Sequence, residues 1–394
     1  MTGADRLDRD LEPLLRRRRE QGLYRRRRVV SGPQGPRLHV DGRDCLCFCS
    51  NDYLGLAGHP GPAAAMREAA GRYGAGSGAA HLIVGHTAEH QALEEELAAW
   101  TGRPRALLFS TGYMANMGVI NALVGEGDRV LEDRLNHASL LDGGWLSRAR
   151  MRRYPHADLA ALERELAAPD DGRALIVSDA VFSMDGDLAP LGALADLTDR
   201  YGARLMIDDA HGLGVLGPEG AGTPAALGIS WQRLPVYVGT LGKALGTFGA
   251  FVAGSETLIE ALIQRARTYV FTTAPPAPVA AATRCALRLA REESWRRERL
   301  SELVNRFRRE ADPAGLPLAP SQAPIQPLLI GDPHETVRLS EALLAEGILV
   351  SAIRPPTVPP GTARLRITLS AAHRSEDVDR LVETLARHYR RSAA

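Results

Sequence analysis

The chain has 394 residues, of which 45% are hydrophobic and 24% are charged, a composition typical of a globular protein with a sizeable core. The net charge of +1 argues against a strongly basic surface for nucleic acid or anionic membranes. No apolar stretch is long enough to span a membrane, and the acidic, polar N-terminus is unlike a secretory or transit peptide. Four cysteines, three of them alternating at 45, 47 and 49, do not form a disulfide framework. These features predict a soluble cytoplasmic protein.

Residues 1–45 are predicted to form an N-terminal arm. We expect a helix over 11–28, which the SGPQG segment that follows would break. Its leucines would lie on one side: Leu11, Leu14, Leu15 and Leu23. Two runs of arginine in this helix are interpreted as a solvated face, and binding of an acidic substrate group is the alternative. The alternating cysteines are expected to pack as small apolar side chains in a following strand.

Residues 46–290 alternate between short apolar runs and amphipathic stretches. The apolar runs predict five buried strands, at 105–110, 128–133, 174–179, 204–209 and 236–240. Buried strands separated by helices form parallel sheets with covered faces. The pattern therefore predicts a large α/β domain with a mostly parallel sheet and helices on both faces. Such sheets bind ligands at the carboxyl ends of their strands.

Residues 291–394 are predicted to form a smaller α+β domain. A charged helix over 291–311 leads into a proline-rich stretch, and a second helix over 376–390 closes the domain. Strands are expected near 326–331, 348–353 and 363–369.

Lysine is almost absent from this chain. Lysine and arginine together number 48, and only one of them, Lys243, is a lysine. This skew is typical of codon bias that replaces lysine wherever a cation alone is needed. The surviving lysine therefore marks a position where arginine would fail, because arginine cannot lose its proton and act as an amine nucleophile. Chance survival on the surface is the alternative, but Lys243 follows a predicted strand in a glycine-rich turn.

Acidic and imidazole side chains are expected at the same edge of the sheet. Asp208 and Asp209 end a predicted strand, and His211 follows them. The alternative is that these acids only cap a loop. An amine, a buried acid and an imidazole suit pyridoxal 5′-phosphate (PLP), in which lysine forms an imine and an aspartate keeps the pyridine nitrogen protonated. The helix N-terminus at 110–113, together with Thr240, would supply donors for the phosphate.

Three motif matches lack the context that their functions require. The G-x-G-x-x-G at 212–217 is followed by Pro218 and further glycines, which break the helix that a dinucleotide site needs. The H-x-x-E-H at 86–90 fits a zinc-ligand pattern, but no third ligand is evident, so no metal site is expected. The residues around Lys243 do not fit a phosphate-binding P-loop.

Motifs over residues 14–390 resemble the α-oxoamine synthases, which are PLP enzymes of fold type I. The matching motifs are SNDYLGL (50–56), NHASLLDG (136–143), FSMDGDLAPL (182–191), DDAHGLGVLG (208–217), GTLGKALG (239–246) and RPPTVPPGTARLR (354–366). The resemblance implies a homodimer with its active site at the interface, and a decarboxylative condensation of an amino acid with an acyl thioester. The RPPTVP form favours the branch that joins L-alanine to a pimeloyl thioester, carried by coenzyme A or acyl carrier protein, in biotin synthesis.

The resemblance also implies a role for each matching residue. Lys243 would hold PLP and act as the base, Asp208 would pair with the pyridine nitrogen, and His137 would stack on the ring. Ser183 and His211 would reach the ring hydroxyl. Further cofactor contacts would come from Gly112, Tyr113, Thr240 and, toward the partner subunit's phosphate, Thr273. Arg366 would bind the amino-acid carboxylate, and the remaining substrate positions are Arg25, Asn51, Arg354 and Thr357.

One segment departs from the family pattern. The glycine-rich loop, commonly G-S-G-G-S, reads Gly-Ser-Gly-Ala-Ala at 76–80, which affects the loop and the thioester pocket but not the cofactor. Three other functions stay open at this point: a related enzyme with another amino acid or acyl donor, a non-catalytic partner subunit, and a metallohydrolase built on His86 and His90.

Overall fold

A computed structural model describes the backbone of residues 2–393 and the side chains of residues 2–389. The chain forms two compact units. The terminal unit comprises Met1–Ser50, Met184–Gly186 and Ser301–Ala394, and the central unit comprises Asn51–Ser183 and Asp187–Leu300. The expected arm over 1–45 is thus grouped with the C-terminal residues rather than standing by itself.

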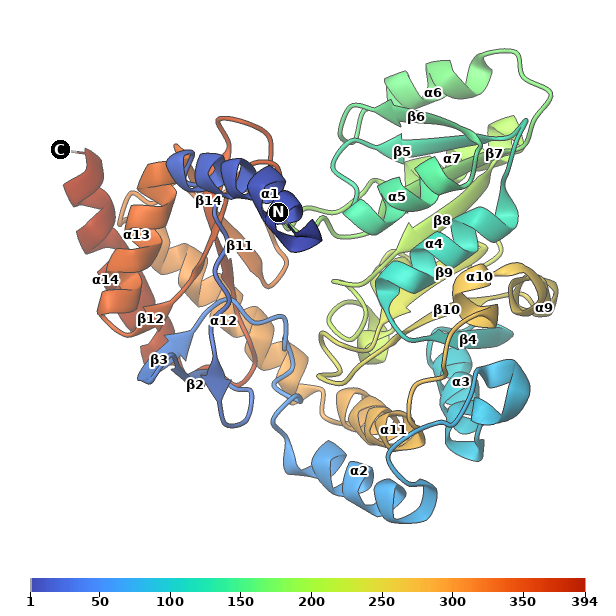
Figure 1. Cartoon of the computed structure of the whole chain (residues 1–394), viewed down its shortest axis with the longest axis horizontal. Helices are drawn as coiled ribbons and strands as arrows, with labels where there is room; N and C mark the ends of the chain where they lie inside the picture. The colour runs from blue at the N-terminus through green and yellow to red at the C-terminus, as the bar shows by residue number, and fades with distance from the viewer. Residues whose placement is uncertain (1, 394) are drawn as a thin grey trace. The chain divides into compact units, whose positions relative to one another are not determined.

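A seven-stranded sheet forms the centre of the central unit, in the order β4-β10-β9-β8-β7-β5-β6 (Figure 1). Its strands are β4 (Arg105–Phe109), β5 (Arg129–Asp133), β6 (Arg150–Tyr154), β7 (Ala174–Asp179), β8 (Arg204–Asp208), β9 (Val236–Thr240) and β10 (Ala250–Gly254). Neighbours from β9 to β6 pair in parallel, and β10 runs antiparallel to both β4 and β9. The predicted mostly parallel sheet is confirmed.

The five predicted strands are all present, and their bounds agree with the prediction to within one residue. The prediction missed β6 and β10. The strand β6 reads Arg-Met-Arg-Arg-Tyr and is largely exposed at the edge of the sheet, so it lacks the apolar run that marks a buried strand. The strand β10 is fully buried, but it follows the glycine-rich turn directly and no helical stretch separates it from β9.

Helices precede the first strand of this sheet, connect most of its consecutive strands and follow its last strand. They are α2 (Pro60–Tyr73), α3 (Ala88–Trp100), α4 (Gly112–Leu123), α5 (Ala138–Leu146), α6 (Leu159–Ala167), α7 (Leu191–Tyr201), α8 (Thr223–Ala226), α9 (Glu256–Arg265), α10 (Arg267–Val270) and α11 (Ala277–Glu292), with a π-helical turn η1 (His81–Gly85) and a 3-10 turn η2 (Pro218–Gly220). No α-helix begins at the G-x-G-x-x-G motif.

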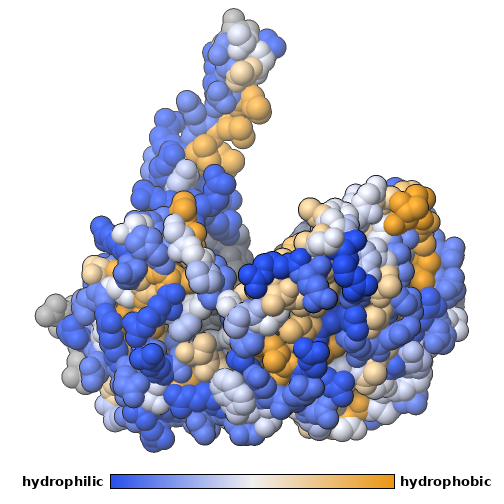
Figure 2. All heavy atoms as spheres, turned by 90° about the horizontal axis from the view of Figure 1, so that it is seen from below, coloured by the Kyte–Doolittle hydropathy of each residue, from blue (hydrophilic) through white to orange (hydrophobic). Residues whose placement is uncertain are grey.

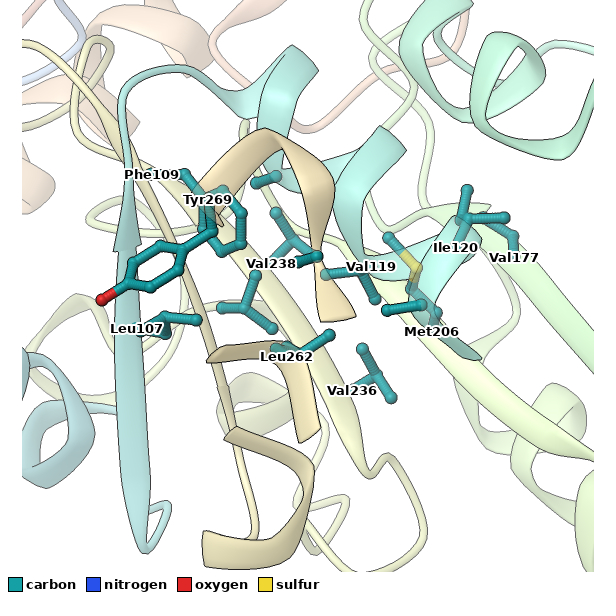
Figure 3. Close-up of a cluster of buried hydrophobic side chains, with 14 of the residues drawn as sticks. Leu107, Phe109, Val119, Ile120, Val177, Met206, Val236, Val238, Leu262 and Tyr269 are labelled. Atoms are coloured by element: carbon teal, nitrogen blue, oxygen red, sulfur yellow. The ribbon is translucent and has the colours of Figure 1, made fainter. Parts of the chain in front are cut away.

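One face of the sheet is covered by a continuous apolar core (Figure 3). Val119 and Ile120 of α4, Leu262 of α9 and Tyr269 of α10 belong to the same buried cluster as side chains from the strands, among them Leu107, Val177, Met206 and Val238. Complete burial of one such side chain contributes about 1.5–3 kcal/mol. This packing fixes α4 against the sheet, so the start of that helix is held beside the strand ends.

The terminal unit contains two small sheets. One has the order β1-β2-β3-β12, and the other has the order β11-β14-β13. Its strands are β1 (Val30–Ser31), β2 (Arg37–Val40), β3 (Arg43–Cys47), β11 (Ile325–Gly331), β12 (Ile348–Leu349), β13 (Ser351–Ile353) and β14 (Ala363–Thr368). Two helices lie wholly in this unit's C-terminal segment, α13 (Pro333–Ala345) and α14 (Ser375–Ala393), and α12 (Trp295–Ala311) joins the units in sequence. The strand expected at 348–353 is split, because its two halves pair in different sheets.

The N-terminal helix α1 (Gly3–Glu20) is shorter than predicted at its C-terminal end. Gly22 has a φ of +64°, a left-handed conformation that commonly terminates a helix, and Leu23 therefore lies outside it. Leu7, Leu11 and Leu14 are exposed, and Figure 2 shows the apolar surface along one side of this helix. None of the helices in residues 2–393 is long and apolar enough to cross a membrane.

Candidate active site

The carboxyl ends of β7, β8 and β9 lie side by side in the central unit. Asp179, the last residue of β7, is in register with Asp208 on β8, and Asp208 is in register with Val238 on β9. Lys243 lies in the turn after β9. That turn is closed by hydrogen bonds from Leu241 N–H to Gly249 O (2.9 Å) and from Gly246 N–H to Lys243 O (2.8 Å). The strands thus bring the lysine and the acids to one edge of the sheet.

Lys243 contacts the imidazole of His211. The lysine Nζ lies 2.8 Å from His211 Nε2, and the other ring nitrogen, Nδ1, lies 2.6 Å from the hydroxyl of Tyr53. Because the Tyr53 hydroxyl donates its proton to Asn51 Oδ1 (3.2 Å), the tautomer that satisfies all three contacts carries its proton on Nδ1. In this tautomer Nε2 has a lone pair that accepts a hydrogen bond from the lysine.

Asp208 is fixed from two sides. Its Oδ2 accepts a hydrogen bond from Asn116 Nδ2 at 2.6 Å, and its Oδ1 accepts one from Ala210 N–H at 2.9 Å. Asn116 projects from α4 and also donates to Ser139 Oγ at 2.8 Å. The buried carboxylate therefore has a defined orientation. Asn116 was not among the sequence candidates.

Asp179 holds the segment that carries His137. Its Oδ2 accepts a hydrogen bond from the His137 backbone N–H at 2.7 Å. Burial, together with the neighbouring Asp208, raises the pKa of Asp179 well above its ordinary value, which favours its neutral form. The ring of His137 lies 2.7 Å from Ser139 Oγ through Nδ1. Desolvation by the surrounding protein lowers the pKa of His137, which favours a neutral ring suited to stacking.

Asp209 has a different role from its neighbour. Its carboxylate accepts hydrogen bonds from Thr223 N–H (2.7 Å), Thr223 Oγ1 (2.6 Å) and the Tyr237 hydroxyl (3.0 Å). Burial raises its pKa to about 6. Of the two interpretations of the acid pair, loop capping fits Asp209, whereas Asp208 has the position of a site residue.

The start of α4 provides free donors near these strand ends. Thr111 caps the helix by accepting a hydrogen bond from Met114 N–H at 3.1 Å, and Gly112 and Tyr113 follow as the first helical residues. Their N–H groups have no acceptor within the helix, so they are available to an anion. A side chain at Gly112 would meet no atom within 4 Å, so there is open space at this position.

The other predicted cofactor residues have the following positions. Thr240 ends β9 and donates from Oγ1 to Gly249 O at 3.2 Å. Ser183 is half-buried beyond β7, and Thr273 is exposed in the segment after α10.

Four of the predicted substrate residues lie in the terminal unit. Arg25 donates to Thr357 Oγ1 at 3.4 Å, across 332 positions of sequence, and Arg354 donates to the Gly22 carbonyl. Burial lowers the pKa of Arg354, and the charge of Arg25 lowers it further to a smaller extent. Arg366 is buried on β14. The fifth residue, Asn51, lies in the central unit and contacts Tyr53.

Comparison with known proteins places the chain in a family. The family described as aminotransferase class I and II matches residues 43–385. The 8-amino-7-oxononanoate synthase of Nitrosococcus oceani is 62% identical over 371 residues, which cover 94% of this chain and 98% of that protein. The chain belongs to this family, in its 8-amino-7-oxononanoate synthase group. The chain is therefore an enzyme of this group.

Solved structures confirm the predicted fold type. A serine palmitoyltransferase variant from S. paucimobilis, determined with bound PLP, is 28% identical and superimposes with a TM-score of 0.92 over 99% of both chains. An 8-amino-7-oxononanoate synthase from Francisella tularensis is 31% identical, with a TM-score of 0.78 over 89% of this chain and 99% of that one. The predicted fold type I PLP-dependent transferase is therefore confirmed.

Proposed function

We propose that this chain condenses L-alanine with a pimeloyl thioester to form 8-amino-7-oxononanoate, CO₂ and the free thiol carrier, a step in biotin synthesis. The cofactor is PLP. The observation that carries the proposal is the contact of 2.8 Å between Lys243 and His211 at the sheet edge that also holds Asp208. The chain's only lysine would be the residue that attaches the cofactor.

The residues at the strand ends fit PLP by their chemistry. Lys243 would attach the cofactor, and Asp208, oriented by Asn116 and by the Ala210 N–H, would keep a proton on its ring nitrogen. The N–H groups at the start of α4 would bind its phosphate without requiring a full positive charge. When bound, PLP supplies an electron sink for the pair of electrons that remains on the substrate Cα.

The chain's own groups would manage the proton. Lys243, once its amine is free, would take the proton from the Cα of alanine, because it is the basic amine at this edge of the sheet. His211 would hold that amine in place through Nε2, and Tyr53 would keep His211 in the tautomer that can accept from the lysine. The neutral ring of His137 would cover the cofactor and exclude water.

The arginines of the terminal unit would bind the anionic parts of the substrates. Arg366 would hold the alanine carboxylate, since a guanidinium binds a carboxylate through two parallel hydrogen bonds. Arg25 and Arg354, which lie close enough for the charge of one to lower the pKa of the other, favour an anionic group of the thioester substrate.

We infer a homodimer in which Thr273 reaches the partner subunit's cofactor phosphate. Apolar side chains are exposed near Thr273 and on η1, among them Phe271 (71% exposed) and Ile83 (73% exposed). An exposed apolar surface of this kind supports an interface with a partner subunit. Light scattering coupled to gel filtration should give twice the mass of the chain.

The reaction is tested by release of free thiol from PLP-loaded protein. Release should require both L-alanine and pimeloyl-CoA, and glycine in place of alanine should release much less. Parallel reactions with pimeloyl-acyl carrier protein would identify the preferred carrier. Release with glycine but not alanine would reject the proposed substrate.

A further inference from the structure

Three histidines come together where η1 meets α3 in the central unit. His81 begins η1, His86 follows it, and His90 lies in the first turn of α3. One ring nitrogen from each residue lies within 4.8 Å of the other two. The expectation that His86 and His90 have no third partner was wrong. The two also do not share a helix face, because α3 begins only at Ala88.

The spacing of the rings matches that of imidazoles around one metal ion. Ring centroids lie 5.1 Å apart for His81 and His86, 5.1 Å for His81 and His90, and 5.7 Å for His86 and His90. With a zinc–nitrogen distance of about 2.0–2.1 Å, each centroid lies about 3.2 Å from the ion, and tetrahedral angles place centroids about 5.2 Å apart. The observed triangle therefore needs little movement to surround an ion.

The hydrogen bonds around the cluster indicate which nitrogen of each ring carries the proton. His90 Nε2 lies 2.7 Å from the carbonyl of Pro275, so Nε2 carries the proton and Nδ1 holds the lone pair. His86 Nε2 similarly faces Gln91 Oε1 at 3.3 Å, and the Nδ1 atoms of His81 and His86 lie 2.9 Å apart. Carbonyl and amide oxygens of this kind commonly orient metal-bound imidazoles from outside.

The cluster contains a buried nitrogen without a hydrogen-bond partner, Nε2 of His81. His81 and His90 are buried, whereas His86 is half-buried.

We propose that His81, His86 and His90 form a binding site for a divalent transition-metal ion of the zinc class, with water as the fourth ligand. His90 Nδ1 faces Thr87, whose N–H lies at 3.0 Å and whose Oγ1 lies at 2.9 Å, and the ion replaces these two contacts. His81 stacks on Tyr269 with centroids 5.0 Å apart, and His90 holds Pro275. The ion therefore ties η1 and α3 to both ends of the segment that carries Thr273.

Zinc titration of the untagged holoenzyme tests this site. After removal of metal with a chelator, calorimetry with Zn²⁺ should show one ion per chain. His86→Ala should weaken binding at least about 100-fold, since loss of a single outer contact already costs 10–100-fold in metal affinity. The matched control is His39→Ala, which removes an exposed histidine that lies 2.9 Å from Asp44 in the terminal unit. The affinity of the His39→Ala variant for Zn²⁺ should be unchanged.

A spectroscopic measurement identifies the ligands independently of activity. X-ray absorption of the zinc-loaded holoenzyme should show imidazole nitrogen and no sulfur. Sulfur ligation would overturn the proposal by moving the ion to the cysteines, and so would the absence of stoichiometric binding or an unchanged affinity in His86→Ala. Circular dichroism establishes that the variant is folded. If it is not, His86→Gln provides the same comparison with a polar side chain retained.

Discussion

Asp208 and Asp209 are consecutive residues at the end of β8, yet they belong to two regions with different uses. Asp209 lies in a closed anchor formed with Thr223 and Tyr237. A Cβ added at Gly212 or Gly222 would come within 2.1 Å or 2.3 Å of its carboxylate, so the backbone packs directly against it. This region has no space for a ligand.

The region around Asp208 is built differently. Its carboxylate accepts two hydrogen bonds, from Asn116 and Ala210, while an ionised carboxylate offers about four lone-pair positions. It also lies at the edge where Lys243 and the start of α4 are found. Burial alone therefore does not identify a catalytic acid. Asp208 is distinguished by the hydrogen-bond positions that its carboxylate leaves open and by the residues that lie near it.

The largest expected effect comes from replacing Lys243, the amine in the region around Asp208. Lys243→Arg keeps the positive charge but cannot attach the cofactor or act as the base. We expect turnover to fall at least about 1000-fold, because general base catalysis alone contributes about 100–10,000-fold. Thiol release with L-alanine and pimeloyl-CoA measures the loss.

A control separates chemistry from folding in this variant. Lys243 lies in a turn closed by backbone hydrogen bonds, so Lys243→Arg should unfold within a few degrees of the wild-type temperature. Turnover at the wild-type rate would remove Lys243 from the mechanism and leave the proposed function without its main support.

The two acids can be compared directly by the same substitution. Asp208→Asn should lower thiol release by about 100-fold or more, since it removes the partner of the cofactor's ring nitrogen, with a small effect on stability. Asp209→Asn should instead lower the free energy of unfolding by about 1–3 kcal/mol, because an amide cannot accept all three hydrogen bonds. Thiol release should fall more in Asp208→Asn, whereas the free energy of unfolding, measured by urea denaturation, should fall more in Asp209→Asn. Equal losses of activity would contradict the division of roles.

Apolar runs were sufficient to predict most of the central sheet. Buried strands such as 174–179 begin with a continuous apolar run. The carboxyl ends of such strands predict where a ligand site lies. The pattern of apolar residues failed where a strand is only partly buried, and where the backbone conformation of one residue sets the end of a helix. The basic edge strand β6 has no apolar run, and α1 ends at Glu20, before the left-handed Gly22, rather than at the end of the arginine-rich stretch.

The candidate site was predicted less completely than the fold. Lys243, Asp208 and His211 could be found because Asp208 lies at the end of a predicted strand and the other two each follow one. Asn116 was missed because it is one polar residue inside an apolar helix, where only the fold shows that it faces Asp208. Asp179 carried the same signal as Asp208, an acid ending a buried strand, and that signal could have found it.

Tyr53 offers a finer test of the Asp208 region, because it acts through His211. Tyr53→Phe removes the hydroxyl that lies 2.6 Å from His211 Nδ1 and leaves the ring's packing intact. We expect kcat to fall about 10-fold, corresponding to one lost hydrogen bond of about 1.4 kcal/mol, with little change in KM for alanine. A changed pH profile of kcat would distinguish this positioning role from a structural one, which would leave the profile unmoved.

A final test concerns the anchor around Asp209, and its effect appears only as a function of pH. Burial raises the pKa of Asp209 from 3.8 to about 6, so the folded state binds this proton more tightly than the unfolded state.

The resulting stabilisation is fully present below about pH 3.8 and is lost as pH rises through about 6. Asp209→Asn does not titrate, so the difference in unfolding free energy between wild type and variant should change across this window and stay constant above pH 7. Buried acids elsewhere, such as Glu94 and Glu132, titrate in both proteins and cancel in that difference. Urea denaturation at a series of pH values measures it. A difference that grows in favour of the wild type as pH rises would show that Asp209 is stabilised in its ionised form, as an open catalytic carboxylate would be.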